Sequence, residues 1–182
     1  MITLLDETRA PSVREIMGRL LSGAETAAIA IAHVRLAAID LQPSELGQLQ
    51  HCRLLLARFD SSFAADAHSL TMDPTRLAQL QRLLAFAESG RLDVHAARSQ
   101  LWLPDFSVYR AVGGRQNALL LGAHYFKQPY PSNAAAFTCV IRDEAAVERA
   151  TQRYESLWQQ SHDVLPVITE TLSELLGCAV VR

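Results

Sequence analysis

Short apolar runs bounded by turn residues alternate with helix signals along this sequence, and this alternation constrains the fold more than any other feature. Several of the runs are nearly continuous in apolar residues, which is typical of strands covered on both faces. We expect strands at residues 27–34, 52–59, 92–96, 105–112, 117–123 and 135–141. Such strands need helices on both faces, so the sequence predicts an α/β fold with a mixed sheet of about six to seven strands.

Helix signals lie between these strands. Ser12 and Glu15 have the spacing of a capping box, in which each side chain bonds a free amide of the first turn. The Asp-Pro pair at 73–74 supplies an N-cap and a proline at the first helical position. Further helices are expected after Asp143 and over residues 166–176, since apolar residues recur there at helical spacing.

The residues 113–116, Gly-Gly-Arg-Gln, separate two of the expected strands, 105–112 and 117–123. A glycine-containing connection of this length between two apolar runs predicts a β-hairpin. The second strand runs into Gly122, a small residue that lets another group approach the backbone closely. The polar side chains of His124 and Tyr125 follow at the same place.

The composition is that of one folded domain over residues 1–182, with 49% hydrophobic and 20% charged residues. The net charge of −2 gives no general electrostatic reason for nucleic-acid binding and leaves only a local basic face as a route to it. Lys127 is the only lysine among 17 basic residues. This use of arginine, together with abundant alanine, matches the coding bias of a GC-rich bacterium.

Metal, disulfide and membrane features are not indicated. Cys52, Cys139 and Cys178 are far apart, so neither a zinc site nor a disulfide framework is expected. The amino terminus does not read as a signal peptide, and no apolar stretch reaches the roughly 20 residues of a membrane span. We expect a cytoplasmic protein with no metal, no cofactor and no membrane contact.

No phosphate-binding glycine loop, serine elbow or zinc-helix motif is present. The histidines lack metal-ligand spacing, and a surface or hydrogen-bonded structural role is the simplest interpretation of each. His33, His95 and His124 stand out because they lie near strand ends, where α/β sheets form ligand crevices.

The order of elements from about residue 92 to 164 resembles the carboxy-terminal half of a unit of the phospholipase D-like superfamily. The stretches that carry this resemblance are "RLDVHAARS" (91–99), "PDFSVYRAVGG" (104–114), "NALLLGAHYF" (117–126) and the Tyr154-x-x-Leu157-Trp158 element. The strands at 27–34 and 52–59 suit the first two strands of such a unit, so the resemblance covers most of the chain. It implies the phospholipase D-like half-unit fold.

The resemblance places the family's His-x-Lys-x4-Asp motif on the first strand of the hairpin, and neither register recovers it. One register puts Asp105, Ser107 and Val112 at the three positions, and a register shifted by one puts Pro104, Phe106 and Ala111 there. The family reaction needs a histidine nucleophile and a lysine that stabilises the phosphoryl oxygens. The resemblance therefore implies a degenerate active site, that is, a pseudoenzyme.

Three functions remain open. The first is a catalytically inactive module that acts by binding or assembly, with nucleic acid, an anionic ligand or a protein as partner. Its candidate ligand-binding residues are His33, Arg35, Arg110, His124, Tyr125 and Lys127.

The second is a phosphodiesterase or nuclease with an altered active site, in which His124 or His95 is the base and Tyr125 or Ser107 assists. The third is an unrelated α/β regulatory domain, which a structure without the 105–123 hairpin in its sheet would favour. The resemblance also implies a homodimer, because the family's site takes two units and this chain has room for one.

Overall fold

One mixed eight-stranded sheet forms the centre of the fold, with the strand order β1-β7-β6-β5-β2-β3-β4-β8. The computed structural model describes residues 2–5, 13–31, 46–59, 63, 73–98, 105–111, 113, 117–121 and 138–180. The strands are Ile2–Leu5 (β1), Ala24–Ile31 (β2), His51–Leu56 (β3), Leu92–Ala97 (β4), Phe106–Ala111 (β5), Ala118–Leu121 (β6), Thr138–Ile141 (β7) and Ser161–Asp163 (β8). Strands β2, β3 and β4 pair in parallel, and the remaining pairs are antiparallel.

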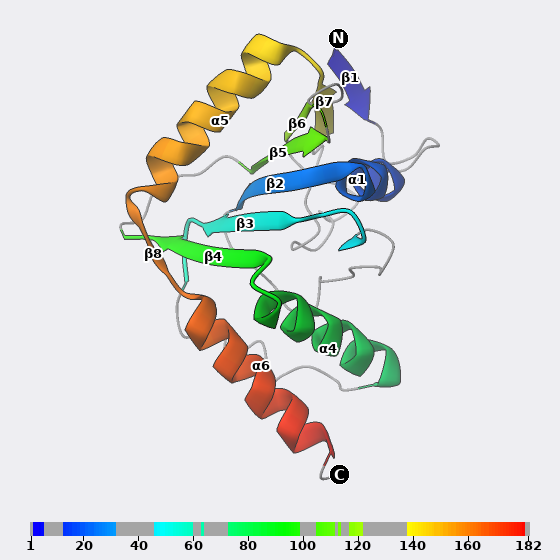
Figure 1. The fold of residues 1–182 in the computed structure, drawn as a ribbon, viewed down its shortest axis with the longest axis vertical. Helices are drawn as coiled ribbons and strands as arrows, with labels where there is room; N and C mark the ends of the chain where they lie inside the picture. The colour runs from blue at the N-terminus through cyan, green and yellow to red at the C-terminus, as the bar shows by residue number, and fades with distance from the viewer. Residues whose placement is uncertain are drawn as a thin grey trace, which may run out of the picture.

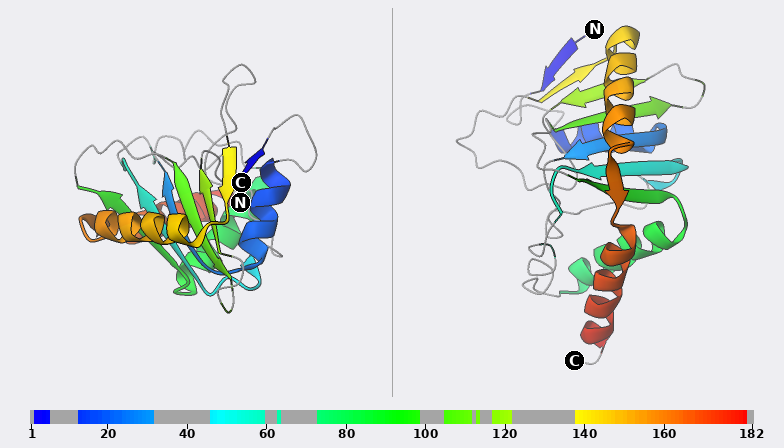
Figure 2. Two further views of the ribbon diagram at one scale, coloured as in Figure 1. Left: turned by 90° about the horizontal axis from the view of Figure 1, so that it is seen from above. Right: turned by 90° about the vertical axis from the view of Figure 1, so that its left-hand side faces the viewer.

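Helices cover both faces of this sheet, as the apolar strands predict (Figures 1 and 2). The helix α5 (Glu144–Trp158) crosses one face, where its Val147, Tyr154 and Leu157 pack on β2, β3, β5 and β6. The other face packs against α1 (Val13–Ser22), α4 (Pro74–Glu88) and α6 (Leu165–Val180). Among the helices in the described ranges, none has the length and apolar character needed to cross a membrane.

The expected helix caps are present where the structure describes them. The carboxylate of Asp73 accepts a hydrogen bond of 2.8 Å from the amide of Arg76, and Pro74 is the first residue of α4. Gly90, with φ of 71°, follows the end of this helix. Asp143 caps α5 in the same way, since it accepts a 2.8 Å bond from the amide of Ala146.

The hairpin lies inside the sheet, as predicted, where β5 pairs with β6 in antiparallel register. Phe106 at the start of β5 lies opposite Leu121 of β6 on one side and Ala30 of β2 on the other. The beginning of β5 and the end of β6 therefore lie at the same edge of the sheet as the last residues of the parallel strands. We call this edge, where β2, β3 and β4 end, the carboxyl edge.

Candidate functional site

Two exposed arginines lie at the carboxyl edge, where α/β sheets form ligand crevices. Arg98 directly follows β4, and Arg58 follows β3 after one intervening residue. Because β3 and β4 are parallel neighbours, their ends are about one strand spacing, or ~5 Å, apart. The carboxyl edge therefore carries two arginines, and Asp105 lies at the same edge directly before β5.

Ser107, which one register of the resemblance aligns with the motif lysine, is fully buried. It lies between Ile29 of β2 and Leu120 of β6, both of which are buried. Its hydroxyl is hydrogen-bonded to the phenol of Tyr109. Burial raises the pKa of Tyr109 well above its usual value, while the bond from Ser107 acts in the opposite direction. Ser107 is thus part of the packed interior of the sheet.

The structure also describes three of the other positions that the resemblance aligns with the family motif. Phe106, the lysine position in the shifted register, packs in the core beneath α5. Ala111, the aspartate position in that register, has no ionisable group. Asp105 is half-buried before β5, at the position of the nucleophilic histidine. Pro104 and Val112 lie outside the described residues.

His95, a catalytic candidate, lies on β4, and its ring contacts two side chains. Its ring stacks on the indole of Trp158 with centroids 3.9 Å apart, and its Nδ1 lies 2.8 Å from the hydroxyl of Ser161. That hydroxyl donates its own proton to the carbonyl of Trp158, so it accepts from Nδ1. Burial lowers the pKa of His95 below 6.5, against the opposing charges of Asp163 and Asp93. These contacts fix the His95 ring against α5 and β8.

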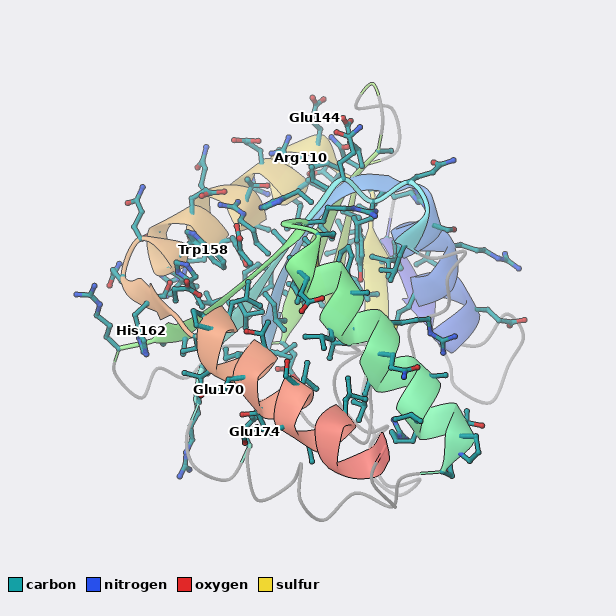
Figure 3. The ribbon with its side chains drawn as sticks, turned by 60° about the horizontal axis from the view of Figure 1, so that its bottom comes forward. Arg110, Glu144, Trp158, His162, Glu170 and Glu174 are labelled. Atoms are coloured by element: carbon teal, nitrogen blue, oxygen red, sulfur yellow. The ribbon has the colours of Figure 1, made fainter. Side chains whose placement is uncertain are left out.

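Arg110, a ligand-binding candidate, lines a groove between α5 and the sheet, at the sheet end opposite the carboxyl edge. Figure 3 shows Arg110 and Trp158 toward opposite ends of α5. The groove, hereafter the α5 groove, has a volume of about 290 Å³. Its lining residues are Thr26, Ala27, Ala28, His51, Arg53, Val108, Arg110, Thr151 and Glu155.

Both arginines that line the α5 groove, and also His51, lie beside an acidic side chain. Arg110 donates to Glu148 at 3.2 Å and to the hydroxyl of Thr151 at 3.1 Å. Arg53 forms a two-pronged ion pair with Glu155, and the imidazole of His51 lies 3.0 Å from the carboxylate of Asp93. Each of the two arginines is thus paired with one carboxylate, and these two ion pairs join α5 to the sheet.

An arginine–aromatic cluster beside this groove was not predicted from the sequence. The guanidinium of Arg53 lies 5.3 Å from the ring centroid of Tyr154 and 5.2 Å from that of Trp158. The phenol of Tyr154 donates a 2.8 Å hydrogen bond to the main-chain carbonyl of Arg53. The available signal was the pair of aromatic residues four positions apart on a helix, which predicts that both rings share one face.

The remaining candidates, His33, Arg35, His124, Tyr125 and Lys127, lie outside the described residues. Their roles stay predictions. Within the described ranges, no three His, Cys, Asp or Glu side chains come together in a way that would hold a metal ion.

The solved structures that share this fold include the following three. The archaeal chromatin protein TrmBL2, which shows a novel mode of DNA binding, matches with a TM-score of 0.53 at 10% identity over 90% of this chain and 53% of that one. Nuc, a phospholipase D family member from Salmonella typhimurium, matches with a TM-score of 0.52 at 11% sequence identity, and the match covers 90% of this chain and 97% of Nuc. Phosphatidylserine synthase from Haemophilus influenzae matches with a TM-score of 0.50 at 9% sequence identity, and the match covers 90% of this chain and 40% of that one.

This chain thus spans about half of TrmBL2 and nearly all of Nuc. At such identities the likeness shows the fold alone, and that fold is the phospholipase D-like α/β fold expected from the resemblance. No model of a protein family matches the sequence, and no curated protein matches it.

Proposed function

We propose that this chain is a catalytically inactive phospholipase D-like module that acts by binding. The observation that carries this proposal is the burial of Ser107 between two apolar strands, at a position where the family has its lysine. A cation there would lie in an apolar interior and not beside a phosphoryl oxygen. Phe106 in the shifted register leads to the same conclusion.

Nucleic acid is the ligand that this geometry supports best. Arg58 and Arg98 bring positive charge to the carboxyl edge, and guanidinium groups bind phosphate oxygens strongly. The fold is shared with a DNA-binding chromatin protein, which is consistent with such a use. Binding through a local cluster also agrees with the slightly negative net charge, because only the edge needs to be basic.

The absence of hydrolysis is tested with bis(p-nitrophenyl) phosphate and with fluorescently labelled single- and double-stranded DNA. We expect no turnover above the buffer rate over a wide pH range. Turnover that is lost in His124→Ala would contradict this expectation and favour the altered-active-site hydrolase.

Binding is tested by the fluorescence anisotropy of labelled DNA over a salt series from about 50 to 200 mM. The double variant Arg58→Ala/Arg98→Ala should weaken binding and reduce the slope of log K against log salt by about one to two. The double variant Arg149→Ala/Arg153→Ala removes the same charge from exposed positions on α5 and should leave the slope unchanged. No binding at the lowest salt, or an equal loss in both variants, would overturn the nucleic-acid assignment.

The same proposal includes a homodimer in which the carboxyl ends of β6 of two copies approach each other. Light scattering coupled to size exclusion measures the mass in solution, and a value of twice 20.1 kDa is expected. A monomer at concentrations well above those of the binding assays would remove the dimer from the proposal and leave the binding function standing.

A further inference from the structure

A second hollow lies on the opposite face of the sheet from the α5 groove, between α1 and the strands β1, β5 and β7. Its volume is about 360 Å³, within the range of small-molecule sites. Arg19, Arg142 and the hydroxyl of Thr3 supply polar groups, and Ile16, Val140 and Tyr109 supply apolar surface. We call it the α1 hollow.

The two arginines of the α1 hollow differ from those of the α5 groove because they form no ion pair with any residue that the structure describes. Within the ranges that the structure describes, neither the Arg19 nor the Arg142 guanidinium makes an ion pair or a hydrogen bond. In the α5 groove, by contrast, Glu155 and Glu148 neutralise both arginines. Two uncompensated cations around one concave surface make it a local site of positive potential.

Local helix electrostatics explain one of these arginines and not the other. Arg19 is in the last turn of α1, where the helix dipole favours a cation. Arg142 immediately precedes Asp143, the N-cap of α5, and the positive end of a helix disfavours a cation. The Asp143 carboxylate is engaged by the helix amide of Ala146. Fold stability therefore gives no reason for the charge of Arg142, whereas a bound anion would.

We propose that the α1 hollow binds a small molecule that carries a dianionic phosphate group on a compact apolar body. Two guanidinium groups match the charge of a phosphate monoester and present donors in a geometry suited to its oxygens. The apolar side chains of Ile16 and Val140 suit a hydrocarbon or ring attached to that phosphate. This inference is independent of the nucleic-acid proposal, because it uses other residues on another part of the molecule.

The test is isothermal titration of the full chain with phenyl phosphate, inorganic phosphate, benzoate and phenol. Phenyl phosphate should bind at one saturable site. It should bind more tightly than inorganic phosphate, which lacks the apolar ring, and more tightly than benzoate, which carries only one negative charge. Phenol, which lacks the anion, should give no saturable signal. The double variant Arg19→Gln/Arg142→Gln should weaken phenyl phosphate binding at least about tenfold, since charge-assisted hydrogen bonds are lost.

The matched control is Arg149→Gln/Arg153→Gln, which removes two exposed charges from α5 and should leave the affinity unchanged. Thermal unfolding checks that each variant is folded. If Arg19→Gln/Arg142→Gln does not fold, the single variant Arg142→Gln is used in its place. Lack of saturable phenyl phosphate binding up to about 10 mM, or equal weakening in the control, overturns the proposal. Unchanged DNA binding in Arg19→Gln/Arg142→Gln separates this result from the carboxyl-edge proposal.

Discussion

The imidazole of His95 lies 3.9 Å from the indole of Trp158, centroid to centroid, with the two ring planes 15° apart. This stack joins the middle of β4 to the last turn of α5, and Ser161 completes it from β8. The Arg53 guanidinium lies over the rings of Trp158 and of Tyr154, which in turn stacks on Trp158. The end of α5 is therefore fixed by aromatic and cationic contacts and not by aliphatic packing alone.

The pKa of His95 makes the stability of this junction depend on pH. Burial lowers the pKa of His95 in the folded protein below 6.5, its value in the unfolded chain. At a pH between these two pKa values, His95 is protonated in the unfolded chain and neutral in the folded protein. The stability from neutral His95 is full above pH 6.5 and is lost as the pH falls below that value. Urea unfolding at several pH values should show a steeper loss of stability on acidification for the wild type than for His95→Gln. Parallel curves would show that His95 titrates as it does in the unfolded chain.

The hydrogen bond from Tyr154 to the carbonyl of Arg53 fixes the helix at a second point. Tyr154→Phe keeps the ring, which contacts Phe106 edge-on at 6.2 Å, and removes only the hydroxyl. We expect the free energy of unfolding to fall by about 1 kcal/mol, because a buried hydrogen bond is lost without a cavity. Chemical denaturation measures this change. A variant as stable as the wild type would mean that water or another donor satisfies the carbonyl.

The Arg53–Glu155 ion pair should contribute a measurable coupling between β3 and α5. Its hydrogen bonds and charge lower the pKa of Glu155 below 4.5. A double-mutant cycle with Arg53→Met and Glu155→Gln should give a coupling free energy of about 0.5–1 kcal/mol, since both side chains are partly exposed.

Two conditions check this coupling. Because the folded pKa of Glu155 is the lower one, the coupling should be full above pH 4.5 and disappear as the pH falls through the folded value. It should also weaken at high salt. A coupling that persists in acid would have to come from the stacking of Arg53 on the aromatic rings.

The elements that the sequence predicted are those whose capping or turn residues lie close together in the chain. The caps at Asp73 and Asp143 and the hairpin of β5 and β6 were all identifiable, because capping and turn chemistry depend on neighbours in the sequence. The expected six to seven strands became eight because β1 and β8 have only four and three residues. Such short edge strands exist through their partners, β7 and β4, and leave no periodic pattern to detect.

The candidate site was less predictable than the fold for a related reason. The fold brings Arg110 of β5 to Glu148 of α5, and His51 of β3 to Asp93 of β4, and neither partner can be inferred from sequence spacing. His95 showed the same limit, since its position near a strand end suggested a ligand, and its neighbours Trp158 and Ser161 come from distant parts of the chain.

Restoring the family's lysine gives the most direct test of the buried hairpin. Ser107→Lys would place an ammonium group between Ile29 and Leu120, where no acidic partner is paired with it in register. We expect a loss of at least about 3 kcal/mol in the free energy of unfolding, because an unpaired charge would be desolvated. Ser156→Lys, at an exposed position of α5, is the matched control and should change stability by less than about 0.5 kcal/mol. If Ser107→Lys were as stable as the control, β5 would have to turn this position toward solvent, and the assignment of a dead site would lose its main support.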